Sequence, residues 1–231
     1  MGKKTATMCG RFSLSTPAKS LADFFEIEIL PKILPRFNIA PSQDLSAIRF
    51  DEQEKNRVYS PFKWGLIPSW AKDPKIGYRM INARAETVAE KPAYRSAFKK
   101  RRCLIMADGF YEWQKLTDKK QPYYFHLKEH SPFAFAGLWE SWQHTKSKAI
   151  QSCTLITTEA NSTLKKVHHR MPVILDPKDY DQWLDPNEKD PKKLEKLLKP
   201  YPPKKMTGYP VSTRVNNPQN DSKECIKPKD S

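Results

Sequence analysis

The chain has 231 residues, of which 38% are hydrophobic and 11% are aromatic, so it can bury the core of one large domain or two small ones. No window reaches the roughly 18 apolar residues that a membrane span needs, and the N-terminus lacks the apolar segment of a signal peptide. No CxxC spacing occurs among the cysteines, which argues against a disulfide framework or a zinc finger; they are Cys9, Cys103, Cys153 and Cys225. These features predict a cytoplasmic protein that does not bind membranes.

The formal net charge is +15, and six tryptophans are interleaved with 41 lysines and arginines. Phosphate binding and base stacking need this combination of side chains, so a polyanionic partner is favoured over a merely lysine-rich surface. The run Lys99–Arg102 is also typical of a nuclear localisation signal. Its place between a predicted helix and a predicted strand instead favours a solvated or phosphate-facing turn.

The sequence pattern in the first half of the chain predicts two helices and two strands. A helix is expected at 17–25 with Ser15 or Thr16 as its N-cap, and Asn82 is expected to begin a short helix that ends at Lys91, before a proline. Between these helices, extended segments are predicted at 45–50 and 57–66.

The second half is richer in strands, which are predicted at 103–113, 123–127, 133–139 and 153–158, with a polar hairpin loop at 115–121. Two late helices have start signals at Asp176-Pro177 and Asp190-Pro191. After Asn216 the polar tail is expected to be frayed. Because neither a repeat nor a linker is visible, we predict one α+β domain over 9–226, preceded by a leader or extension at 1–8 and followed by a polar tail at 227–231.

Four short clusters could carry chemistry: MCGRF at 8–12, INARAET at 81–87, ADGFYEW at 107–113 and VHHRMP at 167–172. Each has a structural alternative. Asn82 can be a helix N-cap, and the His168-His169 pair can be structural or, less readily, metal-binding. Glu112 can be a polar strand end, but its aromatic neighbours suggest a desolvated acid whose pKa is raised for proton transfer.

Cys9 would be unusually reactive if it were the first residue, because it would then carry both a free α-amine and a thiol. Their ordinary pKa values are roughly 7.7–8.0 and about 8.5, so both keep a nucleophilic fraction near neutral pH. An aldehyde can be attacked by the amine and then captured by the thiol as a five-membered ring. Met1–Met8 precede Cys9 in the sequence, and removal of Met1 alone would expose Gly2.

Three further segments, FNIAP at 37–41, WGLIPSW at 64–70 and VSTRVNN at 211–217, extend the set of motifs from residue 9 to about residue 226. Together the motifs closely resemble the SOS-response-associated peptidase (SRAP) family, whose members include abasic-site processing proteins of bacteria and animals. The resemblance implies an α+β fold with a mixed, mostly antiparallel, barrel-like core and peripheral helices. It also implies a role in the DNA damage response.

The resemblance further implies binding of abasic sites in single-stranded DNA and a covalent thiazolidine crosslink through Cys9, with no metal or organic cofactor. It assigns Asn82 to orienting Cys9, Glu112 to acid–base chemistry and His168 to the catalytic position of the histidine pair. The matching DNA-binding positions are Arg11 and Arg84 for phosphate, Trp70 for base stacking and Trp113 beside Glu112. At position 71 this chain has alanine where some members have a second tryptophan, which predicts weaker strand-separating stacking.

Two other functions are open at this point. One is a thiol peptidase that uses Cys9, His168 and Glu112 to remove its own leader. The other is a non-catalytic, basic module that binds single-stranded nucleic acid. Abasic-site lyase activity is a further expectation for the crosslinking enzyme. In each case we expect a monomer.

Overall fold

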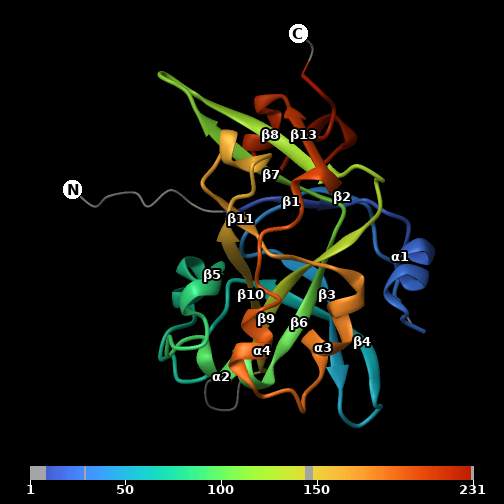
Figure 1. Cartoon of the computed structure of the whole chain (residues 1–231), viewed down its shortest axis with the longest axis vertical. Helices are drawn as coiled ribbons and strands as arrows, with labels where there is room; N and C mark the ends of the chain where they lie inside the picture. Colours follow the sequence, from blue (N-terminus) through green and yellow to red (C-terminus); the bar gives the residue numbers. More distant parts are fainter. Residues whose placement is uncertain (1–8, 29, 144–147, 230–231) are drawn as a thin grey trace.

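The computed structural model describes residues 9–28, 30–143 and 148–229, so the predicted leader at 1–8 lies outside the described residues. It contains two mostly antiparallel sheets and few helices (Figure 1), which confirms the α+β prediction. The helices are α1 (Ala18–Phe25), α2 (Arg95–Lys100), α3 (Tyr180–Leu184) and α4 (Pro191–Glu195). None of the helices in these described ranges is long and apolar enough to cross a membrane.

The smaller sheet has five strands in the order β13-β8-β7-β1-β2. Their bounds are β1 (Phe12–Leu14), β2 (Arg36–Ile39), β7 (Gly109–Lys115), β8 (Lys120–Leu127) and β13 (Met206–Pro210). The predicted hairpin loop at 115–121 is confirmed as a shorter connection between β7 and β8, closed by a hydrogen bond from the Leu116 N–H to the Lys119 carbonyl oxygen.

The larger sheet has eight strands, with the path β11-β10-β4-β3-β6-β9-β12 and β5 paired to β10. Because β9 also pairs with β10, the strands β10, β4, β3, β6 and β9 close a ring. Their bounds are β3 (Asp44–Asp51), β4 (Asn56–Trp64), β5 (Asn82–Arg84), β6 (Arg102–Ala107), β9 (Phe133–Trp142), β10 (Ile150–Glu159), β11 (Arg170–Pro172) and β12 (Ile174–Leu175).

The main core lies where the two sheets face each other. The Phe12 ring of β1 packs 5.2 Å from the Trp64 ring of β4 and 5.7 Å from the Phe135 ring of β9, measured between centroids. Phe110 of β7 also contacts Phe135. Since all four side chains are almost fully buried, these contacts fix the first strand, and with it Cys9, against both sheets.

The predicted helix beginning at Asn82 is wrong. Asn82–Arg84 instead form β5, which pairs in parallel with Leu155–Thr157 of β10, and only Ala85–Thr87 form a short 3-10 helix. Ala83 is fully buried in this arrangement. Pairing with a core strand thus overrides the local helical preference of the segment.

Three smaller predictions also need correction, and all involve polar side chains with distant partners. Ser15 and Thr16 do not cap α1; both donate hydrogen bonds to the carboxylate of Asp108. Asp108 also divides the predicted strand at 103–113 into β6 and β7. The tail after Asn216 is packed rather than frayed, because Asp221 accepts hydrogen bonds from the Phe37 and Asn38 N–H groups.

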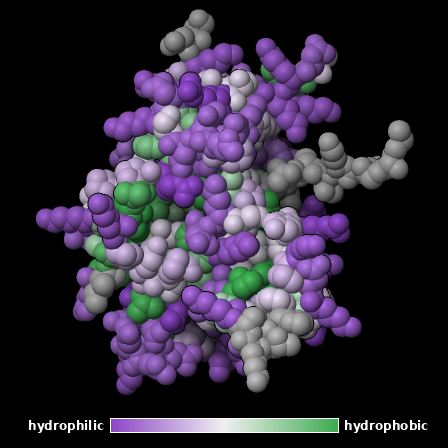
Figure 2. Space-filling view, turned by 180° about the vertical axis from the view of Figure 1, so that it is seen from behind, coloured by the Kyte–Doolittle hydropathy of each residue, from purple (hydrophilic) through white to green (hydrophobic). Residues whose placement is uncertain are grey.

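The surface seen from behind is mainly hydrophilic, and its hydrophobic side chains form separate patches (Figure 2).

The basic run Lys99–Arg102 was predicted to form a solvated or phosphate-facing turn, and this prediction is wrong for Arg102. The Arg102 side chain is buried, with only 4% of its surface exposed. Its guanidinium donates to backbone carbonyl oxygens at the end of α2, within α3 and in the segment after α3. Arg102 is therefore a structural side chain.

Candidate active site

Cys9 lies immediately before β1 and is brought to Glu112 by the pairing of β1 with β7, in which Phe12 faces Phe110. The Cys9 backbone nitrogen donates a 2.8 Å hydrogen bond to Glu112 Oε1. Cys9 is 1% exposed and has a φ of 22°, in the left-handed region. A buried residue with this unusual backbone conformation is typical of a functional site.

Asn82 approaches Cys9 from the other sheet. Its Nδ2 atom donates a 3.2 Å hydrogen bond to the Cys9 carbonyl oxygen. The backbone carbonyl oxygen of Asn82 accepts a 3.2 Å hydrogen bond from the Tyr94 hydroxyl. β5 holds Asn82 in place by parallel pairing with β10. The site therefore depends on the strand that the sequence failed to predict.

His168 completes the cluster from the turn that precedes β11. Its Nδ1 atom lies 3.9 Å from Glu112 Oε2 and within 3.2 Å of the backbone nitrogen and carbonyl oxygen of Arg170. The Arg170 guanidinium forms a two-pronged ion pair with Glu86, with distances of 2.6 and 2.9 Å. This pair ties the INARAET motif to the HHRMP motif and so fixes the segment that carries His168.

Burial controls the protonation states in the cluster. It raises the pKa of Glu112 to about 8, although hydrogen bonds from the Cys9 and Trp113 N–H groups oppose the shift. Burial, and secondarily the Glu112 carboxylate, raises the pKa of the Cys9 thiol. Burial also lowers the pKa of His168. At neutral pH the site therefore holds a protonated carboxylic acid beside a neutral imidazole, which can donate and accept protons respectively.

We expect Glu112→Gln to stabilise the protein selectively at high pH. The pKa of Glu112 rises from an ordinary 4.5 to about 8 on folding, so the folded state binds the proton more tightly than the unfolded state. Its contribution to stability is then complete below pH 4.5 and is lost as the pH rises through 8. Glutamine resembles the protonated acid and should abolish that loss, which amounts to several kcal/mol by pH 9 at about 1.4 kcal/mol for each tenfold change.

Thermal unfolding of both proteins between pH 5 and pH 9, the range set by these pKa values, measures this effect. The matched control is Glu140→Gln, because Glu140 is also buried but is paired with Arg101 at 2.7 Å. Parallel stability curves for Glu112→Gln and the unmodified chain would show that Glu112 is ionised in the folded protein.

A cleft of about 700 Å³ opens beside the cluster. Glu112, His168 and His169 line it, together with Arg11 and Trp113 and three lysines on its walls, namely Lys115, Lys120 and Lys165. Within the described part of the chain these lysines form no ion pairs. The cleft thus combines a buried acid, an aromatic side chain and unneutralised positive charge, which suits an anionic ligand.

The C-terminal segment fixes two of the predicted DNA-binding side chains in the cleft. The Arg11 guanidinium donates to Asn38 Oδ1 at 2.8 Å and to the Val215 carbonyl oxygen at 2.6 Å. Trp113 Nε1 donates to Asn216 Oδ1 at 2.8 Å. Asn38 and Asn216 were not singled out as site residues, although both belong to motifs that the sequence shows. These asparagines hold Arg11 and Trp113 in place, and the sequence does not show this because each contact joins segments that are distant along the chain.

Trp70 and Arg84, the other two predicted DNA-binding residues, do not line the cleft. Trp70 is 60% exposed in a turn, and the adjacent Ala71 carbonyl oxygen accepts a 2.7 Å hydrogen bond from Trp142 Nε1. Arg84 is exposed at the end of β5. Both are available to a ligand that extends beyond the cleft.

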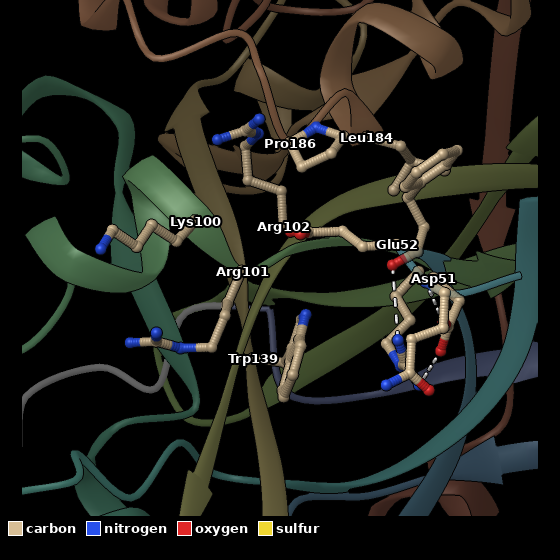
Figure 3. Close-up of a pocket in the computed structure, with 11 residues that line it drawn as sticks. Asp51, Glu52, Lys100, Arg101, Arg102, Trp139, Leu184 and Pro186 are labelled. Carbon is tan, nitrogen blue, oxygen red and sulfur yellow. Dashed lines mark hydrogen bonds and ion pairs between the residues drawn. The ribbon is translucent and has the colours of Figure 1, made fainter. Parts of the chain in front are cut away.

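A second cavity, of about 380 Å³, shares no lining residue with this cleft and lies between the β3–β4 hairpin and the end of α2. Figure 3 shows Asp51 and Glu52 on one side of Trp139 and Lys100 and Arg101 on the other. Its charges are largely satisfied within the protein: Asp51 pairs with Arg49, and Arg101 pairs with Glu140. We therefore place the candidate active site in the cleft beside Cys9.

Among residues 9–28, 30–143 and 148–229, no three His, Cys, Asp or Glu side chains are grouped so that they could hold a metal ion. The cluster described here consists of Cys9, Asn82, Glu112 and His168.

Comparison with known proteins places the chain among relatives. The model of the SOS response associated peptidase (SRAP) family matches residues 8–218. The abasic site processing protein YoaM of Bacillus subtilis is 47% identical over 223 residues, which cover 95% of this chain and 97% of YoaM. The abasic site processing protein HMCES of Xenopus tropicalis is 36% identical, with 84% of this chain and 66% of HMCES covered.

A solved structure supports the same relationship. The crystal structure of a protein from Bacteroides thetaiotaomicron matches with a TM-score of 0.84 and 25% identity, covering 96% of this chain and 100% of that chain. The match of the family model to most of the sequence, together with these relatives, is decisive. The chain belongs to the SOS response associated peptidase family.

Proposed function

We propose that this protein processes abasic sites in single-stranded DNA by forming a covalent thiazolidine through Cys9, once the Cys9 nitrogen is a free α-amine. The observation that carries the proposal is the 2.8 Å contact between that nitrogen and Glu112, a buried acid at the edge of a basic cleft. The names of the relatives YoaM and HMCES support the substrate class.

The ring-opened sugar of an abasic site carries an aldehyde at C1′. The Cys9 amine adds to this carbon, and loss of one water gives an imine. The Cys9 sulfur then adds to the imine carbon while the thiol proton passes to the imine nitrogen, which closes the ring. The overall reaction joins aldehyde, amine and thiol with release of one water and needs neither oxidant nor reductant.

The neighbouring side chains supply the proton transfers. Glu112, with its raised pKa, donates the proton that allows the hydroxyl of the first adduct to leave as water. Because the Arg170 backbone engages His168 Nδ1, we assign Nε2 of His168 to the ring opening that produces the aldehyde. There the imidazole passes a proton to the sugar ring oxygen and takes up the proton of the C1′ hydroxyl, so it is neutral before and after the step. Asn82 orients Cys9 through its carbonyl oxygen.

Single-stranded DNA fits the surface around the cleft. The cleft lysines and Arg11 meet phosphates, and Arg84 extends the positive surface along the strand. The exposed Trp70 offers a stacking face for a base, and Trp113 faces the sugar that lacks one. A base-free position leaves room for Cys9 to reach C1′.

A second candidate function, removal of the leader by the protein itself, is favoured by the same contact. If Cys9 Sγ attacks the carbonyl carbon of the preceding peptide bond, the bond to the Cys9 nitrogen breaks and a thioester forms. Glu112 accepts a hydrogen bond from that nitrogen and, as a protonated acid, can protonate it when the bond breaks. Water then hydrolyses the thioester, which restores the thiol and leaves the free α-amine that crosslinking requires.

Denaturing electrophoresis of protein that begins at Cys9 tests the main proposal. We expect a heat-stable adduct with single-stranded DNA that contains an abasic site, and none with the same strand lacking it, because only the former carries an aldehyde. Annealing the complementary strand should reduce the yield, since the duplex cannot enter the cleft as readily. Equal adduct formation on intact DNA would contradict the proposal.

A further inference from the structure

The cleft beside Cys9 carries an excess of positive charge. Among the described residues that line it, Glu112 is the only acidic one, and its pKa of about 8 keeps it mostly protonated at neutral pH. Four cationic side chains line the same cleft, namely Arg11, Lys115, Lys120 and Lys165. A concave surface with this balance of charge attracts small anions as well as DNA.

The charge of these cations is not neutralised within the protein. The guanidinium of Arg11 is held by neutral partners, which are the side chain of Asn38 and backbone carbonyl oxygens of the C-terminal segment. The three lysines form no ion pair with any residue that the structure describes. Burial chiefly lowers the pKa of His168, and nearby positive charges, that of Lys120 among them, add to the shift. Positive charge from the cleft wall thus reaches the reacting cluster.

A ring-opened abasic sugar is itself a phosphorylated aldehyde. Between its aldehyde carbon C1′ and the phosphorus on its 3′ side lie C2′, C3′ and O3′. A free three-carbon aldehyde with phosphate on its third carbon has the same spacing, because C2, C3 and the ester oxygen separate its carbonyl carbon from phosphorus. The cleft of about 700 Å³ is within the range that holds drug-sized ligands, so a molecule this small fits in it.

We propose that the cleft also accepts free aldehydes that carry a phosphate at this spacing and joins them to Cys9 as thiazolidines, and this inference rests on the proposed function. The phosphate lies among the cleft lysines and Arg11. The aldehyde carbon then meets the Cys9 nitrogen, which is in contact with Glu112. Such a compound needs neither a base nor a DNA strand to be recognised, because the recognised groups are the phosphate and the aldehyde.

The reaction balances without a further reactant. The Cys9 amine adds to the carbonyl carbon, and water leaves to give an imine. The Cys9 sulfur adds to the imine carbon while the thiol proton passes to the imine nitrogen, so one protein and one aldehyde give one adduct and one water. Because the ring uses both the nitrogen and the sulfur, the modified protein cannot crosslink to DNA until the ring opens. The aldehyde is therefore a competitor of abasic DNA.

Intact mass spectrometry of protein that begins at Cys9 tests this inference. The rate of adduct formation with glyceraldehyde 3-phosphate is compared with the rate for glyceraldehyde, which lacks the phosphate. The tetrapeptide Cys-Gly-Arg-Phe, which has the sequence of residues 9–12, gives the ratio of the two rates for an aminothiol outside the fold. We expect the ratio for the protein to exceed that ratio by about tenfold, the order that two or three partly exposed charge contacts supply.

The adduct should have the summed mass of protein and glyceraldehyde 3-phosphate less one water, and peptide mapping should place it on Cys9. Lys120→Glu combined with Lys165→Glu should lower the ratio for the protein to that of the peptide. Lys120→Gln combined with Lys165→Gln removes the charges without reversing them and should lower the ratio part of the way. The matched control is Lys128→Glu combined with Lys204→Glu, because both lysines line a different cavity; it should keep the full ratio.

The inference is overturned if protein and peptide show the same ratio, if the added mass maps to another residue, or if the Lys120 and Lys165 variants keep the full preference. Crosslinking to abasic DNA without any preference for the phosphorylated aldehyde would preserve the proposed function and refute the inference alone. A phosphate-dependent adduct on Cys9 in a protein that never crosslinks to abasic DNA would instead refute the proposed function and leave the small aldehyde as the substrate of the site.

Discussion

Cys9→Ser should abolish the stable crosslink to abasic DNA, even in protein whose chain begins at residue 9. The serine retains the α-amine and can form an imine, but its hydroxyl is a much weaker nucleophile than the thiol. The imine then stays reversible and is lost on denaturation unless a hydride reductant traps it. The measurement is adduct yield on a denaturing gel, with and without such a reductant.

Cys225→Ser is the matched control for this experiment. Cys225 is also buried, but it does not line the cleft, and its sulfur contacts the Asn220 carbonyl oxygen at 3.2 Å, a contact that a serine hydroxyl can keep. It should crosslink as the unmodified chain does. A stable adduct from Cys9→Ser without reductant would show that the thiol does not close a ring.

Glu112→Gln and His168→Ala should each slow crosslinking by about 10²–10⁴-fold, the usual contribution of a positioned proton donor or acceptor. Glu112 contacts the reacting nitrogen directly, and glutamine keeps the side-chain shape but cannot release a proton. His168→Ala removes the imidazole that lies 3.9 Å from Glu112. The measurement is the single-turnover rate of adduct formation at saturating DNA, which separates chemistry from binding.

His169→Ala is the natural comparison, because the two histidine rings lie 4.5 Å apart and both line the cleft. Only His168 approaches Glu112 in the structure, so His169→Ala should slow the reaction much less. Glu140→Gln should leave the rate unchanged. If the two histidine variants behaved alike, or if His169→Ala were slower, the assignment within the pair would be wrong.

The sequence predicts the family and the fold class well because the family motifs are short and the patterns that mark strands are local. The extended segments predicted at 45–50 and 57–66 correspond to β3 and β4, which pair as a hairpin. The aromatic and β-branched segments at 123–127, 133–139 and 153–158 mark strands in both sheets. Each of these strands presents its own pattern, whatever its partner.

The remaining features depend on partners that are distant in the sequence. Asn82 lies on a strand only because β10 pairs with it, and its own residues favour a helix. Asp108 interrupts a continuous apolar pattern because Ser13, Ser15 and Thr16 donate to its carboxylate. No local pattern encodes such contacts.

The candidate site shows the same division. Motifs single out Cys9, Glu112 and His168 as residues that could react, and the aromatic neighbours of Glu112 predict the burial that raises its pKa. The sequence does not reveal that Cys9 donates to Glu112, since this contact joins residues 103 positions apart. Likewise the lysines of the cleft walls are indistinguishable from other lysines until β8 and the turn before β11 are placed around the cleft.

The intact mass of the adduct tests the covalent role of the Cys9 nitrogen and sulfur most directly. Protein beginning at Cys9 and protein retaining Met1–Met8 are each mixed with abasic single-stranded DNA, without reductant, after their N-termini have been verified by mass. We predict that the first gives a species with the summed mass of protein and DNA less one water, and that peptide mapping places the DNA on Cys9. The second should bind but form no adduct while its leader remains, because its Cys9 nitrogen is an amide. An equal yield from the uncleaved form, or attachment at another residue, would contradict the thiazolidine mechanism.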